Sequence, residues 1–138
     1  MSPFWPQHFV GVAARLQFCT WNADGLWVAD DEIRHHKLTY LQHLMHTSAL
    51  IFLQELHFTD TDEIAFADWL KRQPGEWTVQ VSRADDRAGG VAILWREIWQ
   101  GPWHFEHHVV QAGALQTIWF RDALGSVQVA ACNVHFSP

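Results

Sequence analysis

The chain has 138 residues, of which 49% are hydrophobic and 17% are charged, and its formal net charge is −6 at pH 7. This length is enough for one domain with a real core, and the composition excludes an intrinsically disordered chain. The negative charge argues against a general polyanion-binding module, because such modules carry a basic face. It does not exclude an enzyme that holds an anionic substrate through a metal ion.

The N-terminus has no basic region followed by a long apolar stretch, so a secretory signal is not expected. No apolar run approaches the ~20 residues that a membrane-spanning helix needs, and no membrane is expected as a partner. The expected setting is therefore intracellular, with the nucleus as one candidate compartment.

The aromatic content and the two cysteines of the sequence bear on its core and its surface. Nine Trp and nine Phe are a heavy aromatic load for this length. They indicate either an aromatic-rich core or a surface that packs against something outside this chain. The two cysteines, Cys19 and Cys132, fall in expected buried strands and are interpreted as reduced core residues.

The first half of the chain begins with an expected irregular lead-in over residues 1–14, because Pro3 and Pro6 oppose regular structure. The first strand is expected over residues 16–21. Acidic residues at positions 30–32 mark the start of a helix that should run from about 31 to 46. Its apolar stripe at helical spacing comprises Leu38, Leu41, Leu44 and Met45.

A strand over residues 49–54 and a second helix follow. Asp60 and Glu63 have the spacing of a capping box at the start of this helix, and Pro74 follows its expected end. The stripe expected to be buried comprises Ile64, Ala67 and Leu70, flanked by Phe66 and Trp69.

The second half of the chain changes to the two-residue period of strands. Trp77, Val79 and Val81 alternate with polar residues, and two glycines at 89 and 90 precede an apolar run typical of a strand buried on both faces. Further strands are expected over residues 108–111, 116–121 and 126–133, the last two joined by a hairpin-type connection. The order of elements predicts an α/β fold, with parallel pairing across a helical crossover in the first half and an antiparallel meander in the second.

Glu55 is the strongest single candidate for chemistry. It follows an apolar run and Gln54 at the end of the strand over residues 49–54. A carboxylate held there is partly desolvated and needs a cation or a donor beside it. Mg²⁺ suits such a position, because it binds through one or two carboxylates and keeps waters that substrate phosphate oxygens can replace. The alternative is a strand-end Glu that caps a helix or faces water.

Asn22 and Asp24 follow the first strand in the same way. An Asn-x-Asp-Gly sequence is also an ordinary turn. However, one crossover helix separates the two strands, and this topology brings their ends to the same edge of the sheet. The two strand ends are therefore expected to lie side by side and to hold a divalent metal.

His135 and the other histidines of the sequence have different expected roles. His135 directly follows the last expected strand, so it could face the same edge and donate a hydrogen bond to a phosphate, although a lone histidine is often structural. Without cysteines or carboxylates at ligand spacing, the remaining candidates are expected to be solvated rather than zinc ligands. These are His35, His36, His43, His46, His107 and His108.

Four sequence motifs together resemble the endonuclease/exonuclease/phosphatase superfamily, the DNase I-like group. They are residues 21–26 (WNADGL), 53–55 (LQE), 89–94 (GGVAIL) and 133–138 (NVHFSP). The resemblance covers residues 15–138 and is strongest to the retrotransposon-type and apurinic-type endonucleases. It implies a four-layer α/β sandwich, in which two β-sheets, including a mixed one, are flanked by helices.

The resemblance also implies roles for individual residues. Glu55 matches a metal ligand, and Asn22 matches a residue that positions the metal or phosphate. Asp24 matches an acidic position near the metal, and His135 falls where the family has a tyrosine or histidine near the scissile phosphate. The implied reaction is attack of an activated water on a DNA phosphodiester, with Mg²⁺, or alternatively Mn²⁺, stabilising the developing charge.

Two motifs of the family do not occur in this sequence: an Asp-x-Asn that orients water and phosphate, and a Ser-Asp-His that supplies an acid–base histidine. The chain is therefore interpreted as a truncated sandwich, the N-terminal portion of such a domain, which is catalytically crippled and has little or no activity alone. It is expected to pair with a C-terminal half. Two alternatives stay open. One is a non-catalytic fragment or pseudoenzyme that acts as an interaction module, and the other is a phosphodiesterase of the same fold that acts on phospholipids or inositol phosphates.

Overall fold

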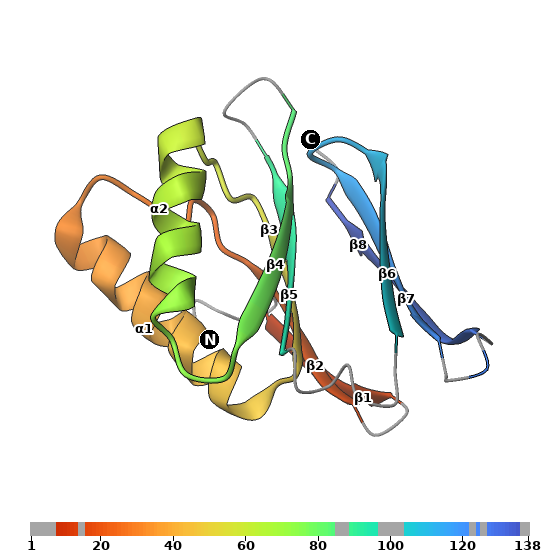
Figure 1. The fold of residues 1–138 in the computed structure, drawn as a ribbon. Helices are drawn as coiled ribbons and strands as arrows, with labels where there is room; N and C mark the ends of the chain where they lie inside the picture. Colours follow the sequence, from red (N-terminus) through yellow and green to blue (C-terminus); the bar gives the residue numbers. More distant parts are fainter. Residues whose placement is uncertain are drawn as a thin grey trace.

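The computed structural model describes residues 8–13, 16–84, 89–96, 104–121, 124 and 127–135. These residues form two helices and two β-sheets (Figure 1). Both helices lie on one face of the larger sheet, and the smaller sheet lies against its other face. None of the described helices has the length and apolarity to cross a membrane.

The larger sheet has five strands in the order β1-β2-β3-β5-β4. The strands are β1 His8–Ala13, β2 Leu16–Asn22, β3 Leu50–Gln54, β4 Trp77–Ser82 and β5 Val91–Arg96. The β2–β3 pair is parallel, and the other neighbouring pairs are antiparallel. Helix α1 (Asp31–Thr47) is the crossover between β2 and β3, and it explains the parallel pair that the order of elements predicted. The larger sheet is therefore mixed.

The smaller sheet is an antiparallel meander in the order β6-β7-β8. Its strands are β6 His104–Gln111, β7 Leu115–Arg121 and β8 Val127–Val134. The expected meander is confirmed, although β6 begins four residues before the predicted strand. With α1 and α2 (Asp60–Lys71) the two sheets make three packed layers, which confirms the α/β class and fits the expected partial sandwich (Figure 1).

The lead-in expected over residues 1–14 is wrong for residues 8–13. These residues form β1, which pairs antiparallel with β2, from His8 opposite Trp21 to Ala13 opposite Leu16. The prolines that suggested an irregular segment, Pro3 and Pro6, precede this strand and therefore remove no N–H from its ladder. The strand also lies at the edge of the sheet.

Helix α1 spans Asp31–Thr47. The Asp30 carboxylate accepts the N–H of Ile33 at 3.0 Å and so satisfies one of the free donors of the first turn. The predicted stripe of three leucines and Met45 is buried against the sheet. The four histidines of this helix are exposed, as expected.

Helix α2 spans Asp60–Lys71, and its start differs from the prediction by one residue. Thr59 Oγ1 accepts the Asp62 N–H at 3.1 Å, and Asp62 Oδ2 accepts the Thr59 N–H at 2.9 Å. The capping box is therefore formed by Thr59 and Asp62, not by Asp60 and Glu63. Thr59 takes this position because its backbone is extended while Asp60 is already helical.

The predicted stripe of α2 is also wrong in part. Phe66 and Leu70 are buried, but Ile64 is 71% exposed. Phe66 packs against Phe58 and Trp69, with ring centroids 5.4 Å and 5.8 Å apart. Because residues four apart share one helix face, the aromatic contacts of Phe66 set the buried face and turn Ile64 outward.

Two hydrophobic clusters hold the three layers together. The first lies between the helices and the larger sheet and includes Trp21, Leu41, Phe58 and Phe66. The second lies between the two sheets and comprises Leu50, Phe52, Ile93, Trp95 and Ile118, with Phe18 and Ala131 packed against it. Strand β5 contributes to both clusters, which confirms the prediction that it is buried on both faces.

Candidate functional site

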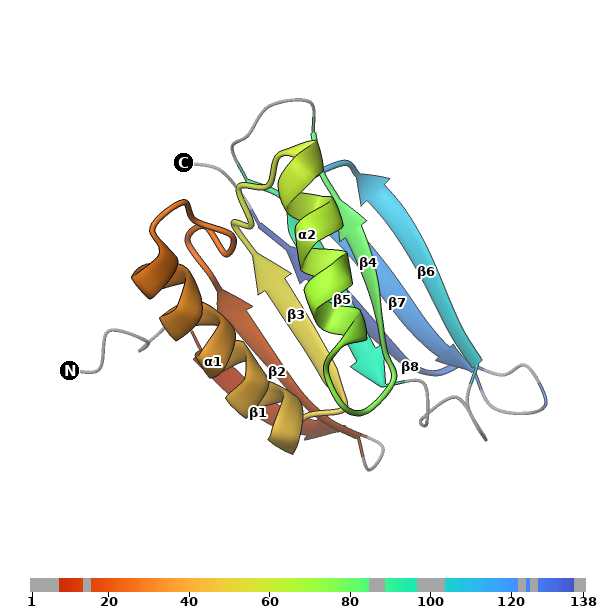
Figure 2. The same ribbon diagram turned by 60° about the vertical axis from the view of Figure 1, so that its left-hand side comes forward.

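The carboxyl ends of β2 and β3 lie side by side at one edge of the larger sheet (Figure 2). The chain segments that follow stay paired beyond the strands. The N–H of Gly25 donates to the carbonyl of Glu55 at 2.7 Å, and the N–H of Leu26 donates to the carbonyl of Leu56 at 3.1 Å. The structure thus brings the two predicted strand ends together.

Glu55 occupies a backbone conformation that non-glycine residues seldom adopt. Its φ is +52°, in the left-handed region. The residues after it are fixed by bonds from the Leu56 N–H to the Gly90 carbonyl at 3.2 Å and from the His57 N–H to the Gly89 carbonyl at 2.9 Å. The predicted glycine pair before β5 therefore has a definite role, because its carbonyls anchor the segment that carries Glu55.

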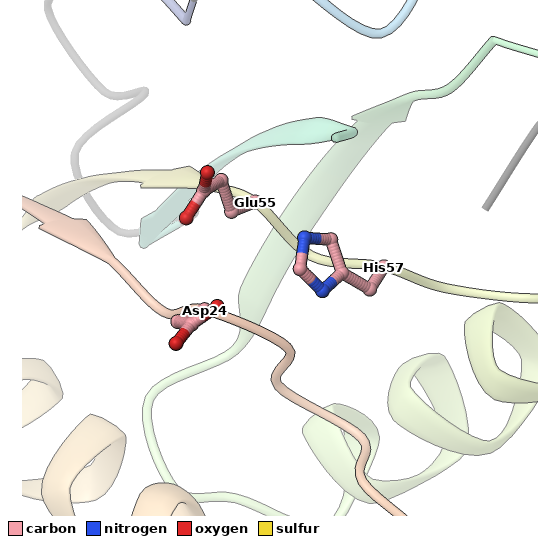
Figure 3. Close-up of side chains that lie close together, drawn as sticks. All are labelled: Asp24, Glu55 and His57. Carbon is pink, nitrogen blue, oxygen red and sulfur yellow. The ribbon is translucent and has the colours of Figure 1, made fainter. Parts of the chain in front are cut away.

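Three side chains converge at this edge: Asp24, Glu55 and His57 (Figure 3). Each offers one metal-ligating atom, and these atoms all lie within 4.8 Å of one another. Asp24 is exposed, while Glu55 is half-buried. The predicted pair of carboxylates is thus joined by an imidazole that the sequence analysis did not select.

His135 reaches the same edge from the end of β8 in the other sheet. Its Nε2 lies 3.2 Å from Oε1 of Glu55, and its side chain is 15% exposed. Its backbone N–H donates to the carbonyl of Ala114 at 2.8 Å, which fixes its position beside the turn between β6 and β7. The structure therefore places His135 next to Glu55, as the sequence suggested.

Asn22 has a different contact from the other three predicted residues. Its Oδ1 accepts the backbone N–H of Asp24 at 3.1 Å, which is the side-chain-to-backbone bond of an Asx turn. The contact shapes the turn that presents the Asp24 carboxylate. In this structure Asn22 therefore acts on the site through Asp24.

Lys37 of α1 was not predicted, and it holds the same turn from the helix side. Its Nζ donates to the carbonyls of Ala23, Asp24 and Gly25 at 2.7, 2.8 and 2.6 Å. Burial lowers the pKa of the Lys37 ammonium, and the nearby Asp24 carboxylate opposes this effect by raising that pKa. No pattern in the sequence identifies a lysine that binds a loop more than ten residues away.

A network of amide side chains within the strands fixes the residues next to the site. Gln54, which directly precedes Glu55, donates to Thr20 Oγ1 at 2.9 Å and to Asn133 Oδ1 at 2.7 Å. Asn133 Nδ2 in turn approaches the carbonyls of Leu53 and Ala92 at 3.1 and 3.0 Å. Because Asn133 lies in β8, two residues before His135, this network links the positions of Glu55 and His135.

The donor set fits a divalent cation. Two carboxylates and one imidazole can approach a common centre, and further positions would be left for water or substrate oxygens. The residues present are therefore compatible with the Mg²⁺ or Mn²⁺ expected from the sequence.

The comparisons with protein families and with curated proteins identify no relative of this chain. A scan against protein-family models finds no match for the chain, and a search of curated proteins finds no significant match. Functional inference therefore depends on the site itself and on the motif resemblance described above.

Proposed function

We propose that this chain is the N-terminal part of a Mg²⁺-dependent phosphodiesterase, an endonuclease that cleaves DNA and needs further residues for efficient turnover. One observation carries the proposal: the Glu55 carboxylate, at the end of a buried strand, lies within ligand-sharing distance of Asp24 and 3.2 Å from His135. A rigid carboxylate pair beside a histidine is suited to holding a cation and a phosphate group together.

Each site residue has a role in this proposal. Asp24 and Glu55 would hold the metal, and a bound Mg²⁺ would stabilise the charge that develops on phosphate oxygens. Asn22 and Lys37 fix the turn that presents Asp24. His135 is positioned to donate a hydrogen bond to a phosphate oxygen near the metal, while its contact with Glu55 orients the ring.

The DNA substrate and the need for further residues are inferred from the motifs. The four motifs most resemble those of retrotransposon-type and apurinic-type endonucleases. The Asp-x-Asn and Ser-Asp-His motifs that would orient water and protonate a leaving group do not occur in this sequence. A protein that carries only the first set of motifs should bind metal and turn over slowly.

Metal binding is the direct test of the site. We expect a Mg²⁺ titration followed by NMR to shift the backbone signals of Asn22, Asp24 and Glu55. Glu55→Gln should abolish these shifts because it removes a charged ligand, whereas Glu32→Gln, on the exposed face of α1, should leave them unchanged. If Mg²⁺ and Mn²⁺ both leave these signals unmoved, the metal site does not exist and a non-catalytic interaction module becomes the better interpretation.

Substrate is tested separately with supercoiled plasmid, inositol phosphates and sphingomyelin vesicles. We expect slow, metal-dependent nicking of the plasmid that Glu55→Gln removes and no release of phosphate or phosphocholine. Rapid cleavage by this chain alone would refute the need for further residues. Turnover of inositol phosphate or lipid with intact plasmid would instead support the alternative substrate class.

A further inference from the structure

Among the described residues, His57 is the histidine that lies within 4.8 Å of both Asp24 and Glu55, and it has no role in the proposed function. We infer that His57 is a nitrogen ligand of the metal site and that it makes the site prefer Mn²⁺ to Mg²⁺. This inference rests on the proposed function only for the existence of a metal site at Asp24 and Glu55.

The position of the imidazole supports this role. A ligating nitrogen of His57 lies within 4.8 Å of ligating oxygens of both Asp24 and Glu55. Figure 3 shows the nitrogen-bearing edge of the ring turned toward the two carboxylates. One cation placed among these three atoms could therefore contact all of them after small side-chain adjustments.

The backbone holds His57 in this position. Its φ is +55°, and its N–H is bonded to the Gly89 carbonyl at 2.9 Å. The ring lies beside Gly25, because a β-carbon built at that position would be 3.4 Å from Nδ1 of His57. Positive φ at both residue 55 and residue 57 directs these two side chains to the edge where Asp24 lies.

The chemistry of the donors gives the metal preference. Mg²⁺ prefers oxygen ligands and an octahedral shell that retains water, whereas imidazole suits first-row transition metals. A site of two carboxylates alone would accept Mg²⁺ and Mn²⁺ with similar affinity. The nitrogen of His57 would add affinity mainly for Mn²⁺, so His57 would set the selectivity and the carboxylates would supply the charge.

Calorimetric titration of the full chain with MnCl₂ and with MgCl₂ tests the selectivity. Loss of an outer-shell partner typically costs ~10-fold in metal affinity, so His57→Ala, which removes a direct ligand, should weaken Mn²⁺ binding by at least about that factor. Mg²⁺ affinity should change by less than about twofold, because water can replace the imidazole. His43→Ala, an exposed histidine of α1, is the matched control and should alter neither affinity.

Spectroscopy on the Mn²⁺-loaded chain tests the ligand directly. Electron spin echo spectra of the wild-type protein should show coupling of Mn²⁺ to a directly bound ¹⁴N nucleus, and His57→Ala should remove it. Coupling that survives in His57→Ala and disappears in His135→Ala would assign the nitrogen to His135 and overturn the inference. Absence of ¹⁴N coupling in the wild type would overturn it as well.

Two controls separate this inference from the proposed function. Glu55→Gln should abolish binding of both metals, so a chain in which Glu55→Gln abolishes binding and His57→Ala has no effect keeps the metal site and rejects the role of His57. Because His57 has positive φ, His57→Gly provides a second variant in which the backbone is unstrained. Agreement between the two variants excludes misfolding as the cause of lost Mn²⁺ affinity.

Discussion

Lys37 shows how one side chain can position a site without taking part in it. Its ammonium binds three successive carbonyls of the turn that carries Asp24. In Lys37→Met the methylene stem remains but the donors are lost, so the turn should loosen. We expect metal affinity to fall ~10-fold, the typical effect of losing an outer-shell partner. Calorimetric Mg²⁺ titration measures this change, with Lys71→Met, an exposed lysine of α2, as control. An affinity equal to that of the wild type would mean that the turn holds Asp24 without Lys37.

The two cysteines should differ sharply in reactivity, against the sequence interpretation that both lie in the core. Cys19 is fully buried, and burial raises the pKa of its thiol to about 11, although a hydrogen bond with Ser48 opposes this effect. Cys132 is exposed on the outer face of β8. Because the thiolate is the reactive form, Ellman's reagent at pH 8 should titrate one thiol rapidly in the folded protein and the second only on unfolding. Cys132→Ser should remove the rapid phase, and a rapid phase that persists would contradict the burial of Cys19.

Part of the site could be predicted because the order of strands and helices along the sequence indicates which strand ends lie together. Asp24 and Glu55 could be paired in advance, since an apolar strand, a crossover helix and a second apolar strand place their ends together. The side on which His57 lies could not be derived from its spacing, because the period of two holds for extended strands and both Glu55 and His57 have positive φ. Lys37 could not be predicted either, because its contacts depend on where α1 crosses the turn. That crossing is a property of tertiary packing rather than of local pattern.

At the scale of the element, the start of α2 offers a direct comparison between sequence and structure. Thr59 and Asp62 form the capping box in the structure. Thr59→Ala should therefore lower the free energy of unfolding by about 1 kcal/mol, the usual cost of losing a Thr cap. Thr61→Ala, in the first turn and exposed, should change it by much less. Urea denaturation measures both.

A second variant discriminates between the two capping assignments. If the box were formed by Asp60 and Glu63, Asp60→Ala would be as costly as Thr59→Ala. In the structure Asp60 is bound at the surface to Arg83, with its side chain 93% exposed. Such exposed pairs contribute little, so Asp60→Ala should be milder than Thr59→Ala. The reverse order would restore the assignment made from the sequence.

Elements with strong apolar periodicity were predicted well, and elements defined by pairing were not. The stripe of α1 is as predicted because four apolar residues at helical spacing leave one way to bury them. Strand β1 was missed because an edge strand depends on its partner β2 rather than on its own pattern. The stripe of α2 shifted because the contact of Phe66 with Phe58, which lies outside the helix, decided the rotation of the helix.

At the scale of the whole molecule, a buried polar network joins the two sheets across their apolar interface. Asn133 Nδ2 lies 3.1 Å from Gln116 Oε1, in addition to its contacts with β3 and β5. Its two hydrogens are thus shared among three acceptors from three strands. The sequence predicted the strands of both sheets except β1, but not that β5 lies between β3 and β4 or that β8 packs against β3 and β5. Polar residues in a predicted core strand gave no indication of which partners they would meet.

Asn133 should therefore be costly to replace. Asn133→Ala would leave Gln54 Nε2 and Gln116 Oε1 without this buried partner, whereas the carbonyls of Leu53 and Ala92 stay within the ladder between β3 and β5. Each unsatisfied buried group costs about 1–3 kcal/mol, so a loss of at least about 2 kcal/mol is expected in urea denaturation. Cys132→Ala, at the neighbouring exposed position, should be near neutral. Equal stability of the two variants would show that water replaces the network.

The far end of this network should make the stability of the protein depend on pH. Gln116 Oε1 accepts from Asn133, so its Nε2 is the donor to His107 Nε2, 3.1 Å away, and this requires neutral His107. Burial, with a smaller effect from His108, lowers the pKa of His107 below its ordinary value of 6.5.

Between these two pKa values the unfolded chain binds more protons than the folded one. The contribution of neutral His107 to the free energy of unfolding is therefore fully present above about pH 6.5. It is lost as pH falls through the lower, folded-state pKa. Urea denaturation from pH 7.5 to 5 should show a decline in the wild type that is smaller in His107→Gln, which stays neutral throughout. His108→Gln, at an exposed position, should retain most of the decline. If the wild type and His107→Gln lose stability in parallel, His107 is already protonated at neutral pH. It would then be the donor in its contact with Gln116, and the direction of the hydrogen bonds in the network would be reversed.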